Sequence, residues 1–284
     1  MRVIRAKHGG FCMGVALALN KLDAIVASHS GAMATLGEII HNPQVIESYA
    51  RKGVRCLNSP EEASGEMAVL IRAHGVSRTV EAALRRRCFH VEDATCPRVK
   101  KAQLAIARTT ATGRELLLYG EAAHPEVRGL ISYAAGPGHI FSSPEELEEL
   151  LASCPLQGRS VVLAAQTTQD RLIFDRMRLR LSTYFGDGLT VLDTICDATR
   201  ERQEEAVDLA GRVQAMVVVG GRSSGNTRRL AELATARGVP AVLVETAEEL
   251  DPARFRNCEV IGLTAGASTP KSIIDDVEAR LKSW

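Results

Sequence analysis

The sequence predicts three similar α/β units with mainly parallel sheets. Three observations predict this fold class. Short apolar runs of strand length alternate with helical stretches along the whole chain, which is typical of parallel sheets joined by crossover helices. Cys12, Cys96 and Cys196 each follow a strand-like run and precede a helical stretch. Polar residues recur at similar distances behind each cysteine, which indicates three diverged copies related by a pseudo-threefold axis; one doubly wound sheet is the alternative.

The length and composition limit the class of protein. The chain has 284 residues, 45% of them hydrophobic, which is enough for two or three cores. Lys and Arg number 35 against 34 Asp and Glu, a balance that disfavours nucleic acid as a partner. The longest apolar runs are strand-sized, and the N-terminus reads as a first strand, not a signal peptide. We therefore expect a cytoplasmic protein with no membrane partner.

The elements around the three cysteines are the most regular part of the pattern. Residues 93–96 and 193–196 share a D-x-x-C ending behind an apolar strand, and Cys12 follows a strand as well. Helices are predicted directly behind the cysteines, over residues 13–28, 97–110 and 197–212. Each thiol should therefore lie at a helix N-terminus, with Pro97 suited to a first helical position.

Two further polar positions recur behind each cysteine, each where a predicted strand ends. The first lies 28 or 29 residues beyond the cysteine, at His41, His124 and Ser224. The second lies 62 to 72 residues beyond it, at His74, Thr167 and Ser268. Because parallel sheets gather ligands at the carboxyl ends of their strands, these positions should belong to one functional face.

These landmarks divide the chain into three expected domains. The first spans residues 1–96, with the first strand, Cys12, His41 and His74; the second spans 97–195, with His124, Glu126 and Thr167; the third spans 196–284, with a glycine-containing turn and Ser268.

Three converging thiolates suit either zinc or an iron-sulfur cluster, because helix N-termini favour the anionic sulfur. Structural zinc sites use four ligands, often in close pairs, so a [4Fe-4S] cluster with one iron not held by protein fits three distant cysteines better. That iron could bind a substrate oxygen while the cluster supplies electrons. The alternative is three ordinary buried cysteines. We expect this of the other four, Cys56, Cys88, Cys154 and Cys258, at the opposite ends of the strands.

The turn at Ser224-Gly225-Asn226 leads from a strand into a helix and can present N–H groups and hydroxyls to a phosphate. The segment 265–270 repeats this pattern around Ser268. Both could also be plain capping turns. His41 and His74 could add contacts to the same anion.

The segment His124-Pro125-Glu126 places a carboxyl group at another strand exit, where it could donate a proton near a reducing centre. Thr167 could relay that proton or orient a substrate oxygen. Taken alone, a glutamate at the end of a strand is usually solvated or caps a helix.

Eight ordered motifs together resemble the 4-hydroxy-3-methylbut-2-enyl diphosphate reductases, from Val3 to the end of the chain. They are Gly10-Phe11-Cys12-Met13-Gly14-Val15, Ile40-His41-Asn42-Pro43, Arg72-Ala73-His74-Gly75, Asp93-Ala94-Thr95-Cys96-Pro97, His124-Pro125-Glu126-Val127, Gln166-Thr167-Thr168, Asp193-Thr194-Ile195-Cys196 and Ala265-Gly266-Ala267-Ser268-Thr269-Pro270. The resemblance implies a trefoil of three α/β domains around a central [4Fe-4S] cluster. It also implies reductive removal of an allylic hydroxyl, giving isopentenyl and dimethylallyl diphosphates, as the last step of the non-mevalonate isoprenoid pathway.

The resemblance further implies a role for each matching residue. Cys12, Cys96 and Cys196 look like the cluster ligands and Glu126 like the proton donor, with His124 and Thr167 near the hydroxyl; His41, His74, Ser224, Asn226 and Ser268 look like diphosphate contacts, to which Gly225 adds its N–H. The family often has Ala, Asn and Ser where Met13, Ser223 and Gly225 stand, which leaves room for another substrate preference.

We expect an electron donor such as a ferredoxin or flavodoxin. Two other classes of protein stay open: another three-cysteine cluster enzyme, such as a quinolinate-synthase-like dehydratase, and a non-catalytic redox sensor with a cluster or zinc.

Overall fold

The structure is a computed structural model that describes residues 1–88, 90–154 and 156–284. Its contacts divide the chain into two compact units. The first unit consists of Met1–Ala16, Ile40–Ser48 and Asp197–Trp284, and the second of Leu17–Ile39 and Tyr49–Cys196. Two of the four boundaries fall within helices, one in α1 (Met13–Ser28) and one in α2 (Pro43–Arg51).

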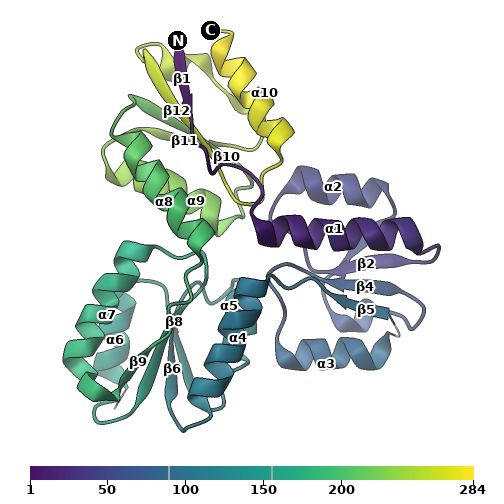
Figure 1. Ribbon diagram of the computed structural model, residues 1–284, viewed down its shortest axis with the longest axis vertical. Coiled ribbons are helices and arrows are strands. Elements are labelled where there is room, and N and C mark those ends of the chain that lie inside the picture. Colours follow the sequence, from purple (N-terminus) through teal and green to yellow (C-terminus); the bar gives the residue numbers. More distant parts are fainter. Residues whose placement is uncertain (89, 155) are drawn as a thin grey trace. The chain divides into compact units, whose positions relative to one another are not determined.

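Sheet A lies in the first unit and has the strand order β1-β12-β10-β11. Its strands are β1 (Arg2–Arg5), β10 (Ala215–Val219), β11 (Ala241–Val244) and β12 (Val260–Ala265). Figure 1 shows α8 (Asp197–Ala210) and α9 (Gly225–Ala236) on one face and α10 (Lys271–Lys282) on the other. Two 3-10 turns, η3 (Ala247–Glu249) and η4 (Pro252–Phe255), complete the unit. Buried aliphatic side chains fill both faces of the sheet.

The second unit holds two sheets of the same connectivity, sheet B in the order β3-β2-β4-β5 and sheet C in the order β7-β6-β8-β9. Sheet B consists of β2 (Met33–Leu36), β3 (Val54–Leu57), β4 (Ala68–Ile71) and β5 (His90–Asp93), and sheet C of β6 (Glu115–Tyr119), β7 (Gly138–Phe141), β8 (Val161–Ala165) and β9 (Leu189–Val191). Their central strands are apolar and buried on both faces, as parallel strands covered by helices require.

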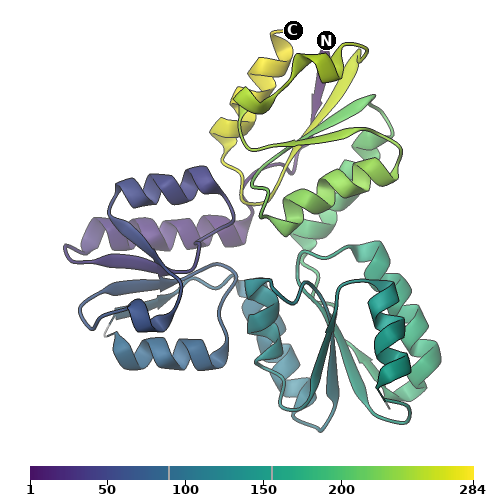
Figure 2. The same ribbon diagram turned by 180° about the vertical axis from the view of Figure 1, so that it is seen from behind.

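Helices cover both faces of each sheet in the second unit (Figures 1 and 2). Sheet B has α1, from residue 17 onward, on one face, with α3 (Arg78–Arg87) and the 3-10 turn η1 (Pro60–Glu62) on the other. Sheet C has α4 (Pro97–Thr110) and α5 (Pro125–Ile131) on one face and α6 (Pro144–Ser153) and α7 (Arg171–Phe185) on the other, followed by the turn η2 (Gly186–Gly188).

The predicted fold class is confirmed: the described strands form three sheets, and every pairing between them is parallel. The helices predicted behind Cys12 and Cys96 have the predicted bounds. The helix behind Cys196 is two residues shorter than predicted and ends at Ala210.

The first strand is where the structure differs from the expected domains. The expected first domain, residues 1–96, includes this strand. In the structure, however, β1 pairs with β12 of the expected third domain, with Arg2 beside Val260 and Arg5 beside Leu263. Each cysteine therefore follows an edge strand (β1, β5 or β9) that completes a sheet and does not open one. No local pattern identifies a strand partner this distant in sequence. The division at residues 96 and 195 otherwise stays a prediction.

The expectation for the remaining cysteines is partly wrong. Cys88 is buried behind α3 as expected, whereas Cys56 lies within β3 and is exposed. Cys56 is the third residue of an edge strand, whose two middle residues are exposed. No helix among the described residues is long and apolar enough to cross a membrane.

Candidate functional site

The predicted polar residues lie at equivalent strand exits in all three sheets. The first set lies five residues beyond the end of the first central strand of each sheet, where β2 leads to His41, β6 to His124 and β10 to Ser224. The second set follows β4, β8 and β12 at a distance of two or three residues, at His74, Thr167 and Ser268. Since these strands are parallel, each pair of exits lies at the carboxyl edge of its sheet, where ligands bind in α/β folds.

In the second unit, Glu126 and Thr167 form the most buried polar contact of the site. Glu126 lies in the first turn of α5 and is 1% exposed. One carboxyl oxygen accepts the Thr167 backbone N–H at 2.6 Å, and the other accepts the Thr167 hydroxyl at 3.0 Å. These two donors fix the orientation of the carboxyl group.

Burial raises the pKa of Glu126 to about 7, although both hydrogen bonds from Thr167 lower it. Loss of solvent disfavours the charged form of a carboxyl group more than two donors stabilise it. Near neutral pH, Glu126 therefore holds its proton part of the time and can act as a general acid.

The raised pKa of Glu126 predicts a pH-dependent loss of stability. Relative to Glu126→Gln, the free energy of unfolding of the wild type is highest below pH 4.5, the ordinary pKa, where both states hold the proton. It falls by about 3 kcal/mol as the pH rises to about 7, because only the unfolded state releases the proton, and then levels off. Urea titrations of both proteins between pH 4 and 9 measure this difference; parallel pH profiles would contradict the assigned burial.

Two histidines lie beside this pair. The Nδ1 atom of His124 accepts the Glu126 backbone N–H at 3.1 Å and so caps α5. The rings of His74 and His124 meet edge to face with centroids 5.4 Å apart. His74, His124, Glu126 and Thr167 are thus brought together within the second unit, as the sequence predicted.

All three cysteines are attached in the same way to the exits that carry the second set of polar residues. The backbone N–H of Cys12 donates to the carbonyl of Ala267, beside Ser268, at 3.1 Å. The N–H of Cys96 donates to Ala73, beside His74, at 2.9 Å, and that of Cys196 donates to Thr167 at 3.1 Å. All three cysteines are half-buried, and each directly precedes a helix.

The two D-x-x-C motifs hold their cysteines through different side chains. In the first motif, Asp93 accepts hydrogen bonds from the N–H and hydroxyl of Thr95 and from Lys100. In the second, Asp193 instead accepts hydrogen bonds from Arg171, and the Thr194 hydroxyl bonds both backbone groups of Ala165 at the end of β8. The two motifs therefore share an aspartate at the same position, but their side chains form different hydrogen bonds.

Two side chains of α8 hold the Cys12 loop, a contact that the sequence did not predict. Arg202, on α8 and 6% exposed, donates to the carbonyl of Gly10 at 2.9 Å. Glu205, one turn further, accepts the backbone N–H groups of Lys7 at 2.6 Å and His8 at 2.9 Å. The two side chains fix the loop that carries Cys12. Their spacing of three residues, which places both on one face of α8, is the only sequence feature that hints at this shared role.

In the first unit, the predicted phosphate turn forms the N-terminus of α9. Ser224 caps this helix, and its hydroxyl accepts the Thr227 N–H at 3.3 Å. Asn226 is 3% exposed, and within the described residues neither atom of its side-chain amide has a hydrogen-bond partner. Because a buried unpaired amide costs about 1–3 kcal/mol, this turn fits a polar ligand better than a plain cap.

The turn is shaped by glycines that allow close approach. Gly220 directly follows β10 with φ +144°, and a Cβ there would lie 2.6 Å from the Thr269 hydroxyl. A Cβ on Gly266 would lie 2.0 Å from the Thr227 hydroxyl. Side chains at these positions would push the turn apart, so glycine is required there.

Ser268 and His41 meet in the same unit. The Ser268 hydroxyl donates to the His41 backbone carbonyl at 3.1 Å. A Cβ on Gly221 would lie 2.5 Å from that carbonyl oxygen, so the glycine of the phosphate turn also packs on the His41 segment. The first unit thus brings together Ser224, Asn226, Ser268 and the His41 backbone. The convergence of this group with the residues of the second unit stays a prediction.

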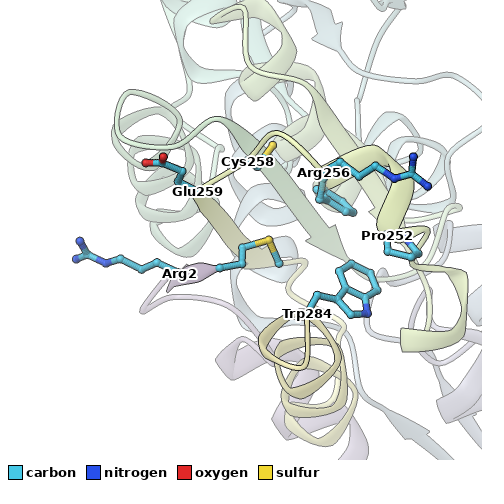
Figure 3. Close-up of a pocket in the computed structure, with 8 residues that line it drawn as sticks. Arg2, Pro252, Arg256, Cys258, Glu259 and Trp284 are labelled. Atoms are coloured by element: carbon cyan, nitrogen blue, oxygen red, sulfur yellow. The ribbon is translucent and has the colours of Figure 1, made fainter.

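A separate cavity of about 560 Å³ lies at the opposite end of sheet A and contains none of the predicted residues (Figure 3). It is lined by Met1, Arg2, Pro252, Phe255, Arg256, Cys258, Glu259 and Trp284. These residues precede or begin strands β1 and β12 or lie near the end of α10, so the cavity is at the amino edge of the sheet.

Comparison with known proteins gives one consistent result. A 4-hydroxy-3-methylbut-2-enyl diphosphate reductase of Desulfovibrio desulfuricans is 55% identical over 290 residues, covering 100% of both chains. One of Geobacter sulfurreducens is 42% identical, covering 100% of this chain and 98% of its own.

Two solved structures resemble the fold over nearly the whole chain. The first is (E)-4-hydroxy-3-methyl-but-2-enyl diphosphate reductase, described as the terminal enzyme of the non-mevalonate pathway, with 37% identity, a TM-score of 0.70 and 100% coverage of both chains. The second is the E-1-hydroxy-2-methyl-but-2-enyl-4-diphosphate reductase of Plasmodium falciparum, with 25% identity, a TM-score of 0.92 and coverage of 99% of this chain and 88% of its own. The pattern of the LytB protein family matches residues 3–282, and the chain therefore belongs to this family.

Proposed function

We propose that the chain reduces 4-hydroxy-3-methylbut-2-enyl diphosphate to isopentenyl and dimethylallyl diphosphates, the last step of the non-mevalonate isoprenoid pathway. Two electrons and two protons replace the carbon–oxygen bond with a carbon–hydrogen bond and release water. The observation that carries this proposal is the buried Glu126 carboxyl group, held by Thr167 at a strand exit and with a pKa of about 7. The activity of relatives that match the whole chain supports it.

Cys12, Cys96 and Cys196 would hold a [4Fe-4S] cluster. Half-buried thiols directly before helix N-termini fit such a group, because the helix dipole favours the thiolate. When bound, the cluster would supply the electrons and, at its one iron without a protein ligand, a place for the substrate hydroxyl. The anchored backbone of each cysteine keeps its thiol beside an exit that carries a substrate-facing residue.

The diphosphate group of the substrate would bind at the N-terminus of α9. The Ser224 hydroxyl, the Gly225 N–H and the Asn226 amide supply donors there, and the helix dipole favours the anion. Ser268, His41 and His74 would add further contacts. This anion would accept a hydrogen bond from the buried side-chain N–H group of Asn226.

The proton that leaves with the hydroxyl would come from Glu126. Its carboxyl group is desolvated and is partly protonated near neutral pH, so it can donate where an oxygen leaves. The Thr167 hydroxyl, 3.0 Å from that carboxyl, would orient the substrate oxygen or pass the proton on, and His124 would lie near the same oxygen. The second proton adds at either end of the allylic system and so gives two products.

We further propose that the protein works in the cytoplasm and receives electrons from a ferredoxin or flavodoxin.

The function is tested on anaerobically purified protein, first by its iron and acid-labile sulfide content and then by adding the allylic diphosphate with a reduced donor. Formation of both diphosphate products supports the proposal. Zinc in place of iron, or a cluster without turnover, would contradict it and favour a redox sensor.

Replacing Asn226 with Leu should separate binding from stability. Because the amide is buried without a partner, we expect the free energy of unfolding to stay the same or rise by up to about 1 kcal/mol. Substrate affinity should fall roughly 10- to 100-fold because donors to a charged group are lost. Urea unfolding and substrate titration measure the two effects.

Asn42→Leu is the matched control for Asn226→Leu. Asn42 is also buried, but its side-chain oxygen accepts the Val45 N–H at 3.0 Å. Its replacement should destabilise the protein by about 1 kcal/mol. Equal destabilisation by both substitutions would show that the Asn226 amide is paired within the protein. Unchanged substrate affinity in Asn226→Leu would show that it has no ligand-binding role.

A further inference from the structure

A cationic cluster that the proposed reaction does not use lies in the second unit, at the carboxyl edge of sheet B. A cavity of about 460 Å³ opens there, and residues from the ends of β2, β3 and β4 and from α3 and α5 line it. In the order β3-β2-β4-β5, the chain leaves β2 on one side and returns to β4 on the other. Such a switch point is where α/β sheets bind ligands.

Two arginines of this cavity, Arg72 and Arg128, form no close ion pair with a carboxylate among the described residues. Arg72 directly follows β4, and its guanidinium lies so close over Gly37 that a Cβ there would be 2.2 Å from Nη1. Its Nε atom donates to the Gly75 carbonyl at 3.4 Å. Arg128 is an exposed residue of α5 that lines the same cavity.

Burial and charges of both signs act on Arg72. Burial lowers the pKa of Arg72, and the positive charge of Arg128 lowers it further, against the opposing influence of Cys56 and Glu38. Glu61 is the one carboxylate that lines the cavity, and it is exposed. Burial and the neighbouring charge of Arg128 both disfavour the charged form of Arg72, and an anion bound beside the two guanidinium groups would offset this cost.

Neutral donors complete the lining. Ser59, Ser77 and Thr79 contribute hydroxyls. Ser77 is the N-cap of α3, a helix of ten residues, and its hydroxyl accepts the Val80 N–H at 3.3 Å. The N-terminus of α3, the positive end of its helix dipole, therefore faces the cavity that contains Arg72 and Arg128.

We infer that this cavity binds the phosphate group of a small phosphorylated metabolite, at a site separate from the Ser224–Asn226 turn. Two guanidinium groups match the oxygens of a phosphate, and hydroxyls and a helix N-terminus supply further donors. A cavity of this volume has room for a small molecule carrying that group.

The position of the cavity connects it to the candidate active site. Arg72 begins the turn that carries His74, closed by the Gly75 N–H to the Arg72 carbonyl at 2.9 Å. Arg128 lies one turn after His124 on the helix that carries Glu126, and its N–H donates to the His124 carbonyl at 3.1 Å. A phosphate bound by both arginines joins these two elements, so the site is suited to an effector.

Equilibrium dialysis of the full chain against radiolabelled inorganic phosphate and, separately, inorganic diphosphate tests this inference. Wild-type protein should bind diphosphate at two independent sites, the cavity and the turn. Arg72→Gln and Arg128→Gln should each weaken the cavity site roughly tenfold or more. Arg128 is exposed, so its variant is informative even if Arg72→Gln fails to fold. The probe that binds the cavity more tightly identifies a phosphomonoester or a diphosphate as the ligand class.

Two variants serve as controls. Arg86→Gln removes an exposed charge from α3 outside the cavity lining and should change neither site. Asn226→Leu should weaken only the site at the turn. Unchanged binding in both cavity variants overturns the inference. If the protein has a single diphosphate site that is lost in Asn226→Leu and kept in Arg128→Gln, the inference fails but the proposed function stands. If that single site is instead lost in Arg128→Gln and kept in Asn226→Leu, the cavity is supported and the proposed diphosphate site at the Ser224–Asn226 turn is contradicted.

Discussion

Replacing Glu126 with Gln is expected to reduce turnover by about 100- to 10,000-fold while the substrate still binds. Glutamine keeps the shape of the side chain and can still accept the Thr167 N–H, which lies 2.6 Å from the carboxyl oxygen. Its amide N–H is too weak an acid to donate a proton to a leaving oxygen. Single-turnover kinetics of the reduced protein measure the chemical step, and a titration with the allylic diphosphate measures binding.

A second variant tests whether the effect runs through the proton on Glu126. Thr167→Val removes the hydroxyl hydrogen bond that lowers the pKa of Glu126, so this pKa should rise above about 7. Because the protonated form is the donor, the fall of kcat at alkaline pH should shift to higher pH. Retained turnover in Glu126→Gln would exclude Glu126 as the proton donor.

Replacing any one of Cys12, Cys96 and Cys196 with Ser should abolish both the cluster and the activity. Changes to groups that only support metal ligands already cost about 10- to 100-fold, so loss of a ligand should lower turnover by more than about 100-fold. Iron and acid-labile sulfide per chain, measured anaerobically, should fall together in all three variants.

Cys56→Ser is the matched control for these substitutions. Cys56 lies within β3, is exposed, and stands apart from the helix N-termini that follow the other three cysteines. It should keep wild-type iron content and turnover. A cysteine variant of the proposed set that retained its iron would show that this cysteine is not a ligand.

Much of the fold could be predicted because its signals are local. The helices behind Cys12 and Cys96 begin where the sequence predicts, since a strand exit, a helix-compatible first residue and an apolar periodicity lie within a few residues of each other. The exits at His41, His124 and Ser224 recur at the same distance from their strands, so simple counting places them. Strand–helix alternation in turn predicts parallel pairing.

The partner of a strand and the environment of a side chain depend on contacts between distant residues. The pairing of β1 with β12 and the unpartnered amide of Asn226 have no local signal. The spacing of Arg202 and Glu205 places both on one helix face, but it does not indicate that they bind the Cys12 loop. The protonation of Glu126 also depends on distant residues, because its pKa follows from burial beside Thr167, 41 residues away in sequence.

The sequence by itself therefore determined the fold class, the helix starts behind the cysteines and the residue types available for chemistry. Only the tertiary structure decided which strand completes each sheet and how strongly each polar group is desolvated. The physical reason is that helix starts and strand periodicity depend on neighbours along the chain. Pairing and desolvation depend on neighbours in space.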